Sequence, residues 1–238
     1  MSQTYQTIQM PSPEVTEQRL VRMQSMAGIL FFTFLALHLS NLPLALFGPR
    51  AFNDYQALLR IFYQQPVVEL VFVLGPIVVH LVAGVWLIFL RRAKRKGVVR
   101  PLKSRLHSWA GIFLMLVIVG HVIAVRGPSF FYDVFPLFEG LSFSLWYFPA
   151  YFYPYYFLLA LAGLYHGLFG LMIVLNRIGI TKKRIRVPVL SYYVGAIIIV
   201  ASLLALDGSF FTVPPQTESE FGILYAEGLN LDINSPWK

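Results

Sequence analysis

The sequence contains no cysteine. This absence excludes disulfides, thiolate zinc sites, covalent c-type haem attachment and any iron–sulfur cluster held by this chain. Charge is scarce as well: only 13% of the 238 residues are Asp, Glu, Lys or Arg, against about 25% in an ordinary soluble domain. Because 57% of the residues are hydrophobic, the composition also excludes an intrinsically disordered chain. The low charge and high hydrophobic content therefore indicate a membrane protein.

Five apolar stretches are long enough to cross a membrane, which takes about 20 residues. They cover about 24–46, 68–90, 106–126, 154–175 and 188–206. We therefore predict an all-α membrane protein with five transmembrane helices, in which residues 24–206 form the transmembrane domain. Residues 1–23 have no apolar core of a signal peptide and are expected to be a cytoplasmic N-terminal segment. Residues 207–238 are expected to be a polar tail on the outer side.

Acidic residues are few, 11 against 19 basic ones, and the net charge is +8. Fifteen of the basic residues fall in 19–22, 91–105 and 176–187, and the other four are Arg50, Arg60, Arg126 and Lys238. The positive-inside rule then predicts a multi-pass protein of the plasma (inner) membrane, with a cytoplasmic N-terminus and an outside C-terminus. Nucleic acid is excluded as a partner because topology explains the charge. Whether the two basic loops also bind an acidic partner or anionic membrane lipid stays open.

The predicted outer loop 127–153 is crowded with aromatic residues. Its three prolines, Pro128, Pro136 and Pro149, argue against one long helix. Aromatic anchoring at the membrane surface and shielding of a bound hydrophobic ligand both stay open for this loop. No role is predicted for the tail.

An internal repeat relates the first four spans. Segments 22–38 and 105–121 share the pattern R-x-x-S-x-x-G-x9-H, and segments 80–91 and 166–177 share H-x-x-x-G-x6-R. The first pattern matches Arg22, Ser25, Gly28 and His38 with Arg105, Ser108, Gly111 and His121, and the second matches His80, Gly84 and Arg91 with His166, Gly170 and Arg177. The first four spans are thus predicted to be two copies of one helical hairpin, with a fifth helix that has no copy.

Four histidines on four different helices fall at two depths. At about 1.5 Å per residue, His38 and His121 lie at one level and His80 and His166 at another. Imidazoles inside a membrane are functional candidates, and each pair could bind the iron of one b-type haem inside a four-helix bundle. The nearby glycines would let a flat, bulky group approach the backbone. A structural zinc ion fits poorly because it needs four ligands. The alternative to haem is that these histidines are hydrogen-bonded within the protein core and bind no cofactor.

Haem propionates need hydrogen-bond donors, and charge-assisted bonds from arginine are the strongest. Candidates around the inner haem are Gln24, Ser25, Ser108, Trp109, Arg91 and Arg177. The arginines could equally anchor the inner face. The fifth histidine, His107, matches Gln24 in the repeat. Its role stays open: it could donate a hydrogen bond to a propionate or to a partner, or it could simply lie on the surface.

Two haems stacked across a bilayer transfer electrons across it. The chain has no dinucleotide-binding, phosphate-binding or nucleophile motif, so no catalytic residue is predicted. Flavin and iron–sulfur chemistry must then belong to other subunits, and the natural electron carrier in the membrane is a quinone.

Over about 20–206 the chain resembles the di-haem, five-helix cytochrome b anchor of succinate dehydrogenase and fumarate reductase, respiratory complex II. The resemblance rests on the two R-x-x-S-x-x-G-x9-H segments, on PIVVHLVAGVW in the second span, and on the histidine followed by Gly and Arg in the fourth. It implies a distal haem on His38 and His121 and a proximal haem on His80 and His166. It also implies an FAD flavoprotein subunit and an iron–sulfur subunit on the cytoplasmic face, and a link to the tricarboxylic acid cycle.

The two-haem branch of that family usually works with menaquinone, which the resemblance implies as the quinone here. The candidates for its site, all weak, are Ser40, Asn41 and Glu69. Two alternatives remain: a di-haem cytochrome b of another quinone-linked oxidoreductase, of the hydrogenase or formate dehydrogenase type, and a small permease whose histidines bind protons or cations.

Overall fold

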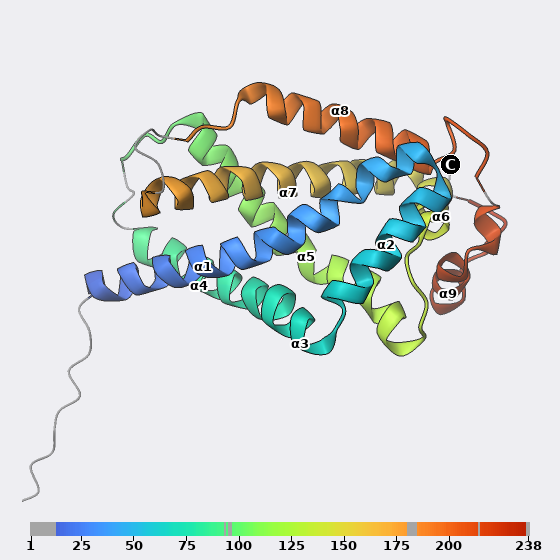
Figure 1. Cartoon of the computed structure of the whole chain (residues 1–238), viewed down its shortest axis with the longest axis horizontal. Helices are drawn as coiled ribbons and strands as arrows, with labels where there is room; N and C mark the ends of the chain where they lie inside the picture. Colours follow the sequence, from blue (N-terminus) through green and yellow to red (C-terminus); the bar gives the residue numbers. More distant parts are fainter. Residues whose placement is uncertain (1–12, 93, 95–96, 180–184, 214, 237–238) are drawn as a thin grey trace, which may run out of the picture.

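The computed structural model describes residues 13–92, 94, 97–179, 185–213 and 215–236. Every regular element in this part of the chain is helical (Figure 1). Five segments are long and apolar enough to cross a membrane, as predicted: Glu14–Phe47, Pro66–Arg92, Leu102–Phe131, Pro149–Ile178 and Val189–Leu206. Helices suit such segments because they satisfy their own backbone N–H and C=O groups where lipid offers no partner. The fold agrees with a multi-pass membrane protein.

Each long segment is built from one main helix. These are α1 (Pro13–Ser40), α4 (Gly75–Arg92), α5 (Leu102–Phe131), α7 (Pro149–Ile178) and α8 (Val189–Leu206). The 3-10 helix η1 (Leu42–Phe47) extends the first segment, and α3 (Pro66–Val68) with the π-helix η2 (Glu69–Leu74) precedes α4. The fifth segment differs by one residue from its predicted range of 188–206.

The first helix begins well before residue 24, where the predicted span begins. Its added turns carry Glu17, whose carboxylate accepts hydrogen bonds from Arg91 Nε at 2.7 Å and Lys94 Nζ at 2.9 Å. These bonds hold the start of α1 against the end of α4, so the helix continues beyond the apolar stretch. Residues 13–23 of the predicted N-terminal segment therefore belong to α1, and residues 1–12 lie outside the described residues.

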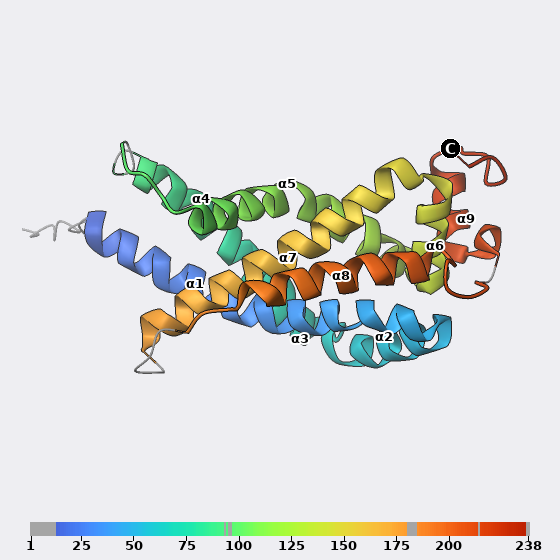
Figure 2. The same cartoon turned by 90° about the horizontal axis from the view of Figure 1, so that it is seen from above.

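The four helices that carry the paired histidines lie together. α1 packs along α4, α5 packs against α7, and α1 also contacts α7, while α8 packs on α7 and η1 (Figures 1 and 2). Many apolar side chains on the outside of this group are exposed, such as Leu116 at 73% and Ile197 at 68%. Lipid is the solvent that suits them. The end that carries Arg91, Arg105 and Arg177 is called the basic end below.

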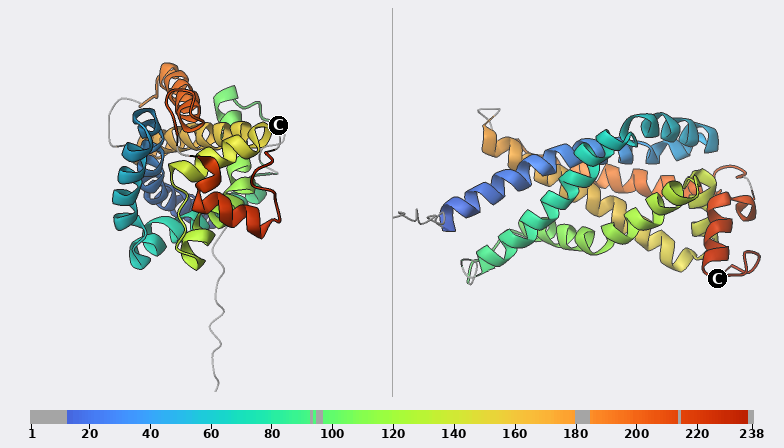
Figure 3. Two further views of the ribbon diagram at one scale, coloured as in Figure 1. Left: turned by 90° about the vertical axis from the view of Figure 1, so that its right-hand side faces the viewer. Right: turned by 90° about the horizontal axis from the view of Figure 1, so that it is seen from below.

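A cap of short helices covers the opposite end (Figures 1 and 3). It contains η1, α2 (Pro49–Tyr63), α6 (Phe138–Tyr147), η4 (Gln216–Glu218) and α9 (Glu220–Gly228). The main buried cluster lies between these elements and the end of α8: Ala45, Phe52, Phe138, Leu145, Ile199, Leu203, Ala205 and Leu206. The best-packed core of the molecule is thus at the cap end.

The aromatic loop 127–153 and the tail both belong to the cap. As the prolines predicted, the loop is not one helix: Pro128 lies in the last turns of α5, Pro136 precedes α6, and Pro149 begins α7. The tail folds back through α9, where Tyr225 donates a hydrogen bond of 2.6 Å to the carbonyl of Ala124 in α5. The tail is therefore an integral part of the cap.

Candidate functional site

The structure brings the four histidines together as two facing pairs. The ring centroids of His38 and His121 are 6.2 Å apart, with ring planes at 73°. Those of His80 and His166 are 6.1 Å apart, with ring planes at 87°. We call these the cap-side pair and the basic-side pair. Along α1, the level of His80 is marked by Gly28, which it contacts, so the two pairs are separated by about ten residues, or about 15 Å.

Backbone carbonyls orient both rings of the basic-side pair. His80 Nδ1 bonds the carbonyl of Gln24 at 3.0 Å, and His166 Nδ1 bonds the carbonyl of His107 at 3.1 Å. A carbonyl oxygen can only accept, so each Nδ1 carries the proton and the Nε2 lone pair is left for another partner. Metal-binding histidines are commonly oriented in this way, with Nδ1–H donated to a carbonyl oxygen. Gln24 and His107 occupy the same position of the repeat, so the duplication extends to these contacts.

Two repeat glycines make room for the same rings. A Cβ atom on Gly28 would lie 3.0 Å from His80 Nδ1, and one on Gly111 would lie 2.7 Å from His166 Cε1. The sequence suggested that these glycines admit a flat ligand. In the structure they admit the imidazole of the neighbouring helix, which explains why each hairpin copy has a glycine at this position.

The cap-side pair has different surroundings. The ring of Phe34 stacks on His38 at 5.5 Å and 20°, and also meets the ring of Tyr63 edge-on at 5.1 Å. The hydroxyl of Tyr155 lies 3.4 Å from His121 Nδ1. Aromatic side chains, in place of backbone carbonyls, thus border this pair.

The spacing within each pair fits one metal ion between two imidazoles. An imidazole nitrogen binds a first-row metal at about 2.0–2.1 Å and lies about 1.1 Å from its ring centre, so opposed ligand rings have centroids about 6.3 Å apart. Both measured separations are within 0.2 Å of that estimate. Among the described residues no group of three or more His, Cys, Asp or Glu side chains could hold a metal ion. Haem needs only two protein ligands because its porphyrin supplies the others, so two imidazoles at this spacing would be enough to hold one.

A cleft of about 490 Å³ lies between α4 and α5 on the basic side of His80. Its lining is apolar: Leu81, Val82, Val85, Trp86, Phe89 and Met115. Such a surface suits the hydrocarbon edge of a macrocycle or a lipid chain.

The proposed propionate donors fall into separate groups. Arg177 Nη1 donates to Ser25 Oγ at 3.0 Å, whereas Arg91 is bound to Glu17. Ser108 Oγ receives a bond of 2.9 Å from Arg100, a residue that the sequence did not single out. Trp109 is 62% exposed, and its ring is 5.8 Å from the guanidinium of Arg105.

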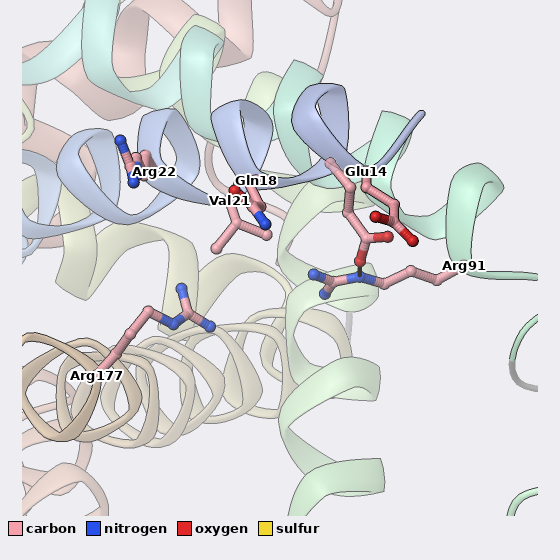
Figure 4. A pocket seen from close by; sticks show the side chains of 7 residues that line it. Glu14, Gln18, Val21, Arg22, Arg91 and Arg177 are labelled. Atoms are coloured by element: carbon pink, nitrogen blue, oxygen red, sulfur yellow. Dashed lines mark hydrogen bonds and ion pairs between the residues drawn. The ribbon is translucent and has the colours of Figure 1, made fainter. Parts of the chain in front are cut away.

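A polar cavity of about 470 Å³ opens at the basic end, between α1, α4 and α7 (Figure 4). Its lining contains three arginines and two glutamates: Glu14, Glu17, Gln18, Val21, Arg22, Arg91 and Arg177. Arg91 is held by Glu17. Figure 4 shows Arg22 and Arg177 on the other sides of the opening from Arg91. Of the predicted donors, Arg91 and Arg177 therefore share this cavity.

His107 lies against the basic-side pair. Its ring stacks on that of His166 at 4.2 Å and 8°, and its Nδ1 is buried with no hydrogen-bond partner among the described residues. Plain surface residence is therefore wrong for His107. The repeat alignment with Gln24 was the sequence signal that placed it here.

The three weak quinone candidates have different surroundings. Ser40 Oγ is 2.9 Å from the hydroxyl of Tyr55. Asn41 is buried, and its Oδ1 has no partner in the part of the chain that the structure describes. Glu69 forms a two-pronged ion pair with Arg126, at 2.7 and 2.9 Å. Of these three candidates, Asn41 is thus the one with a buried polar atom that no described residue binds.

Comparison with protein-family models, with curated proteins and with solved structures finds no match to this chain.

Proposed function

We propose that this chain is the membrane-anchor and electron-transfer subunit of a succinate:quinone oxidoreductase, holding two bis-histidine b haems. The observation that supports the proposal most is the pair of facing histidines at each of two levels, with ring centroids 6.1 and 6.2 Å apart. Two bis-histidine sites would need this arrangement, in which one spacing recurs at two levels on four different helices.

In this proposal, His38 and His121 hold the outer haem, and His80 and His166 hold the inner one. Bound haem supplies one-electron redox chemistry. The chain's own residues do the rest: the carbonyls of Gln24 and His107 keep the inner imidazoles in the tautomer that leaves Nε2 free. Apolar side chains of α1, α4, α5 and α7 keep bulk water away, and the cap covers the outer end.

The partners follow from the resemblance and from the charge. A chain without cysteine receives its electrons from another subunit, so an iron–sulfur subunit and an FAD subunit dock at the basic, cytoplasmic end. Arg22 and Arg177 in the polar cavity present positive charge there. Menaquinone is the proposed electron carrier in the membrane, and the four-helix haem domain with its fifth helix is anchored in the plasma membrane.

A dithionite-reduced minus air-oxidised spectrum of the purified membrane protein tests the haem proposal. We expect a b-type α band and two haems per chain. A protein without that band would overturn the proposal and favour a permease. Co-purification then distinguishes the enzymes, because a flavoprotein with covalent or tightly held FAD and succinate-dependent quinone reduction are expected only for complex II. A hydrogenase or formate dehydrogenase partner would contradict the succinate assignment alone.

A further inference from the structure

Arg60 in the cap has a buried N–H group with nothing to bind. Its Nη1 atom is buried, and no hydrogen-bond partner for it exists among the described residues. Burial lowers the pKa of the Arg60 guanidinium, yet the group stays charged because an arginine does not deprotonate in proteins. A buried charged donor without an acceptor is costly, so Nη1 of the partly buried Arg60 is a candidate to bind a ligand oxygen.

The surroundings of Arg60 hold the guanidinium in place without using Nη1. Its central carbon lies 3.9 Å from the ring centre of Phe135, so the ring covers one face of the guanidinium and offers no hydrogen-bond acceptor to its N–H groups. Asp133 attracts the guanidinium electrostatically but makes no hydrogen bond to Nη1. On the same side of α2, Asn53 is bound to Glu139 and to the backbone N–H of Phe138.

The other described cations at the cap end are already paired. Arg50 is 96% exposed and lies 3.6 Å from Asp54, one turn further along α2. Arg126 gives two hydrogen bonds to Glu69 and one to Ser129 Oγ. Among the described cations at this end, Arg60 is therefore the one with no salt bridge to a carboxylate, although Asp133 acts on it electrostatically.

Arg60 also lies near the cap-side histidine pair. Tyr63, one turn after Arg60 on α2, contacts the ring of Phe34 at 5.1 Å, and Phe34 in turn stacks on His38 at 5.5 Å. Burial raises the pKa of Tyr63, and the charges of Arg60, Glu69 and Arg126 all act on it. Tyr63 and Phe34 thus link the Arg60 end of α2 to the ring of His38 through two successive ring contacts.

We infer that Arg60 Nη1 binds a propionate carboxylate of the outer haem. This inference rests on the proposed function, and it adds a haem-binding residue that neither the repeat nor the resemblance identifies. A guanidinium–carboxylate bond is the strong, charge-assisted kind, and it would satisfy the orphaned N–H. A haem that gains an electron becomes more negative, so a guanidinium at its propionate favours the reduced form.

The test is a redox titration of both haems in membranes that contain the intact complex, with Arg60→Gln compared with the native chain. Arg50→Gln is the matched control, because it removes the same charge from the same helix at an exposed, paired position. His38→Ala identifies the outer haem by its loss. In Arg60→Gln we expect the midpoint potential of the outer haem to fall by about 59 mV, which is a tenfold shift toward the oxidised form for a one-electron couple. The potential of the inner haem should not change, and neither potential should change in Arg50→Gln.

Three results would overturn the inference. The first is an unchanged outer-haem potential in Arg60→Gln. The second is an equal shift in Arg50→Gln, which would show a general charge effect. The third is a raised KM for quinone with no shift in potential, which would assign Nη1 to the quinone headgroup.

Arg60→Lys keeps the test decisive if Arg60→Gln does not assemble. It retains the charge, so we expect the complex to bind both haems and the outer-haem potential to change by less than half as much as in Arg60→Gln. A change as large as that expected for Arg60→Gln, in an assembled Arg60→Lys complex, would contradict the inference. The two proposals fail separately, because a native chain without haem removes the proposed function, whereas a di-haem chain insensitive to Arg60 removes only this site.

Discussion

Gln24 and His107 contribute backbone carbonyls to the basic-side pair, so their side chains are free to differ between the two copies of the repeat. The imidazoles that they orient are the groups that carry the proposed function. A carbonyl acceptor cannot be removed by changing a side chain, and this makes the tautomer of His80 and His166 robust to substitution.

Single histidine substitutions test the pairing. We expect His38→Ala and His121→Ala to lose the same haem, and His80→Ala and His166→Ala to lose the other, because each haem needs both of its axial ligands. Haem content and the reduced difference spectrum measure this. Loss of one and the same haem in His38→Ala and His80→Ala would show that the pairing is wrong.

Gly111→Ala should disturb the proposed inner haem. Its new Cβ would lie 2.7 Å from His166 Cε1, so the ring or the helix has to move, at a cost of about 1–3 kcal/mol for overpacking. The control is Gly127→Ala on the same helix, where a Cβ meets nothing within 4 Å. Spectra of both variants should show a changed inner haem only in Gly111→Ala. Two unchanged spectra would mean that the His166 ring moves aside at little cost in free energy.

Among the elements, η2 and α5 are joined by an ion pair that the sequence could not specify. The carboxylate of Glu69 and the guanidinium of Arg126 are 15% and 29% exposed, and they meet in a two-pronged geometry. The sequence made Glu69 a weak candidate for the quinone site. Its engagement with Arg126 gives it a structural role in the π-helix that begins the second span, a kind of distortion often found near functional sites.

Glu69→Gln should destabilise the protein by about 1–3 kcal/mol, since it leaves the Arg126 charge without its anion. In the double variant Glu69→Gln with Arg126→Gln, part of that loss should be recovered. Thermal unfolding in detergent measures both. Asp54→Asn, which breaks the exposed pair with Arg50, should have an effect near zero; a loss as large as that of Glu69→Gln would argue against the role of burial.

At the scale of the whole molecule, the cap closes one end of the helices and the opposite end is basic. The tail contributes to this closure because α9 packs tightly on α6: a Cβ on Gly222 would lie 2.6 Å from Phe143 Cγ. The hydroxyl of Tyr147 also donates to the carbonyl of Asp232. Cap and basic end thus give the molecule two chemically different faces.

Gly222→Val should loosen the tail without shortening the chain. We expect the outer haem to become more accessible to water-soluble reductants and to be lost at a lower temperature than in the native chain, with the inner haem unaffected. Gly228→Ala is the control, since a Cβ there meets nothing within 4 Å. Equal loss of both haems on heating would show that the cap stabilises the whole bundle and not its outer end.

The sequence by itself determined the five spans, the repeat and the depth of each histidine, because length, hydropathy and position along a helix are linear properties of the chain. It could therefore predict which histidines share a level. The tertiary structure decided everything that crosses between helices: the carbonyl partners of His80 and His166, the glycines that admit their rings, and the engagement of Glu69 with Arg126. It alone showed the buried, unpaired Nη1 of Arg60, since burial depends on Phe135 and α2 meeting across a fold that no local pattern encodes.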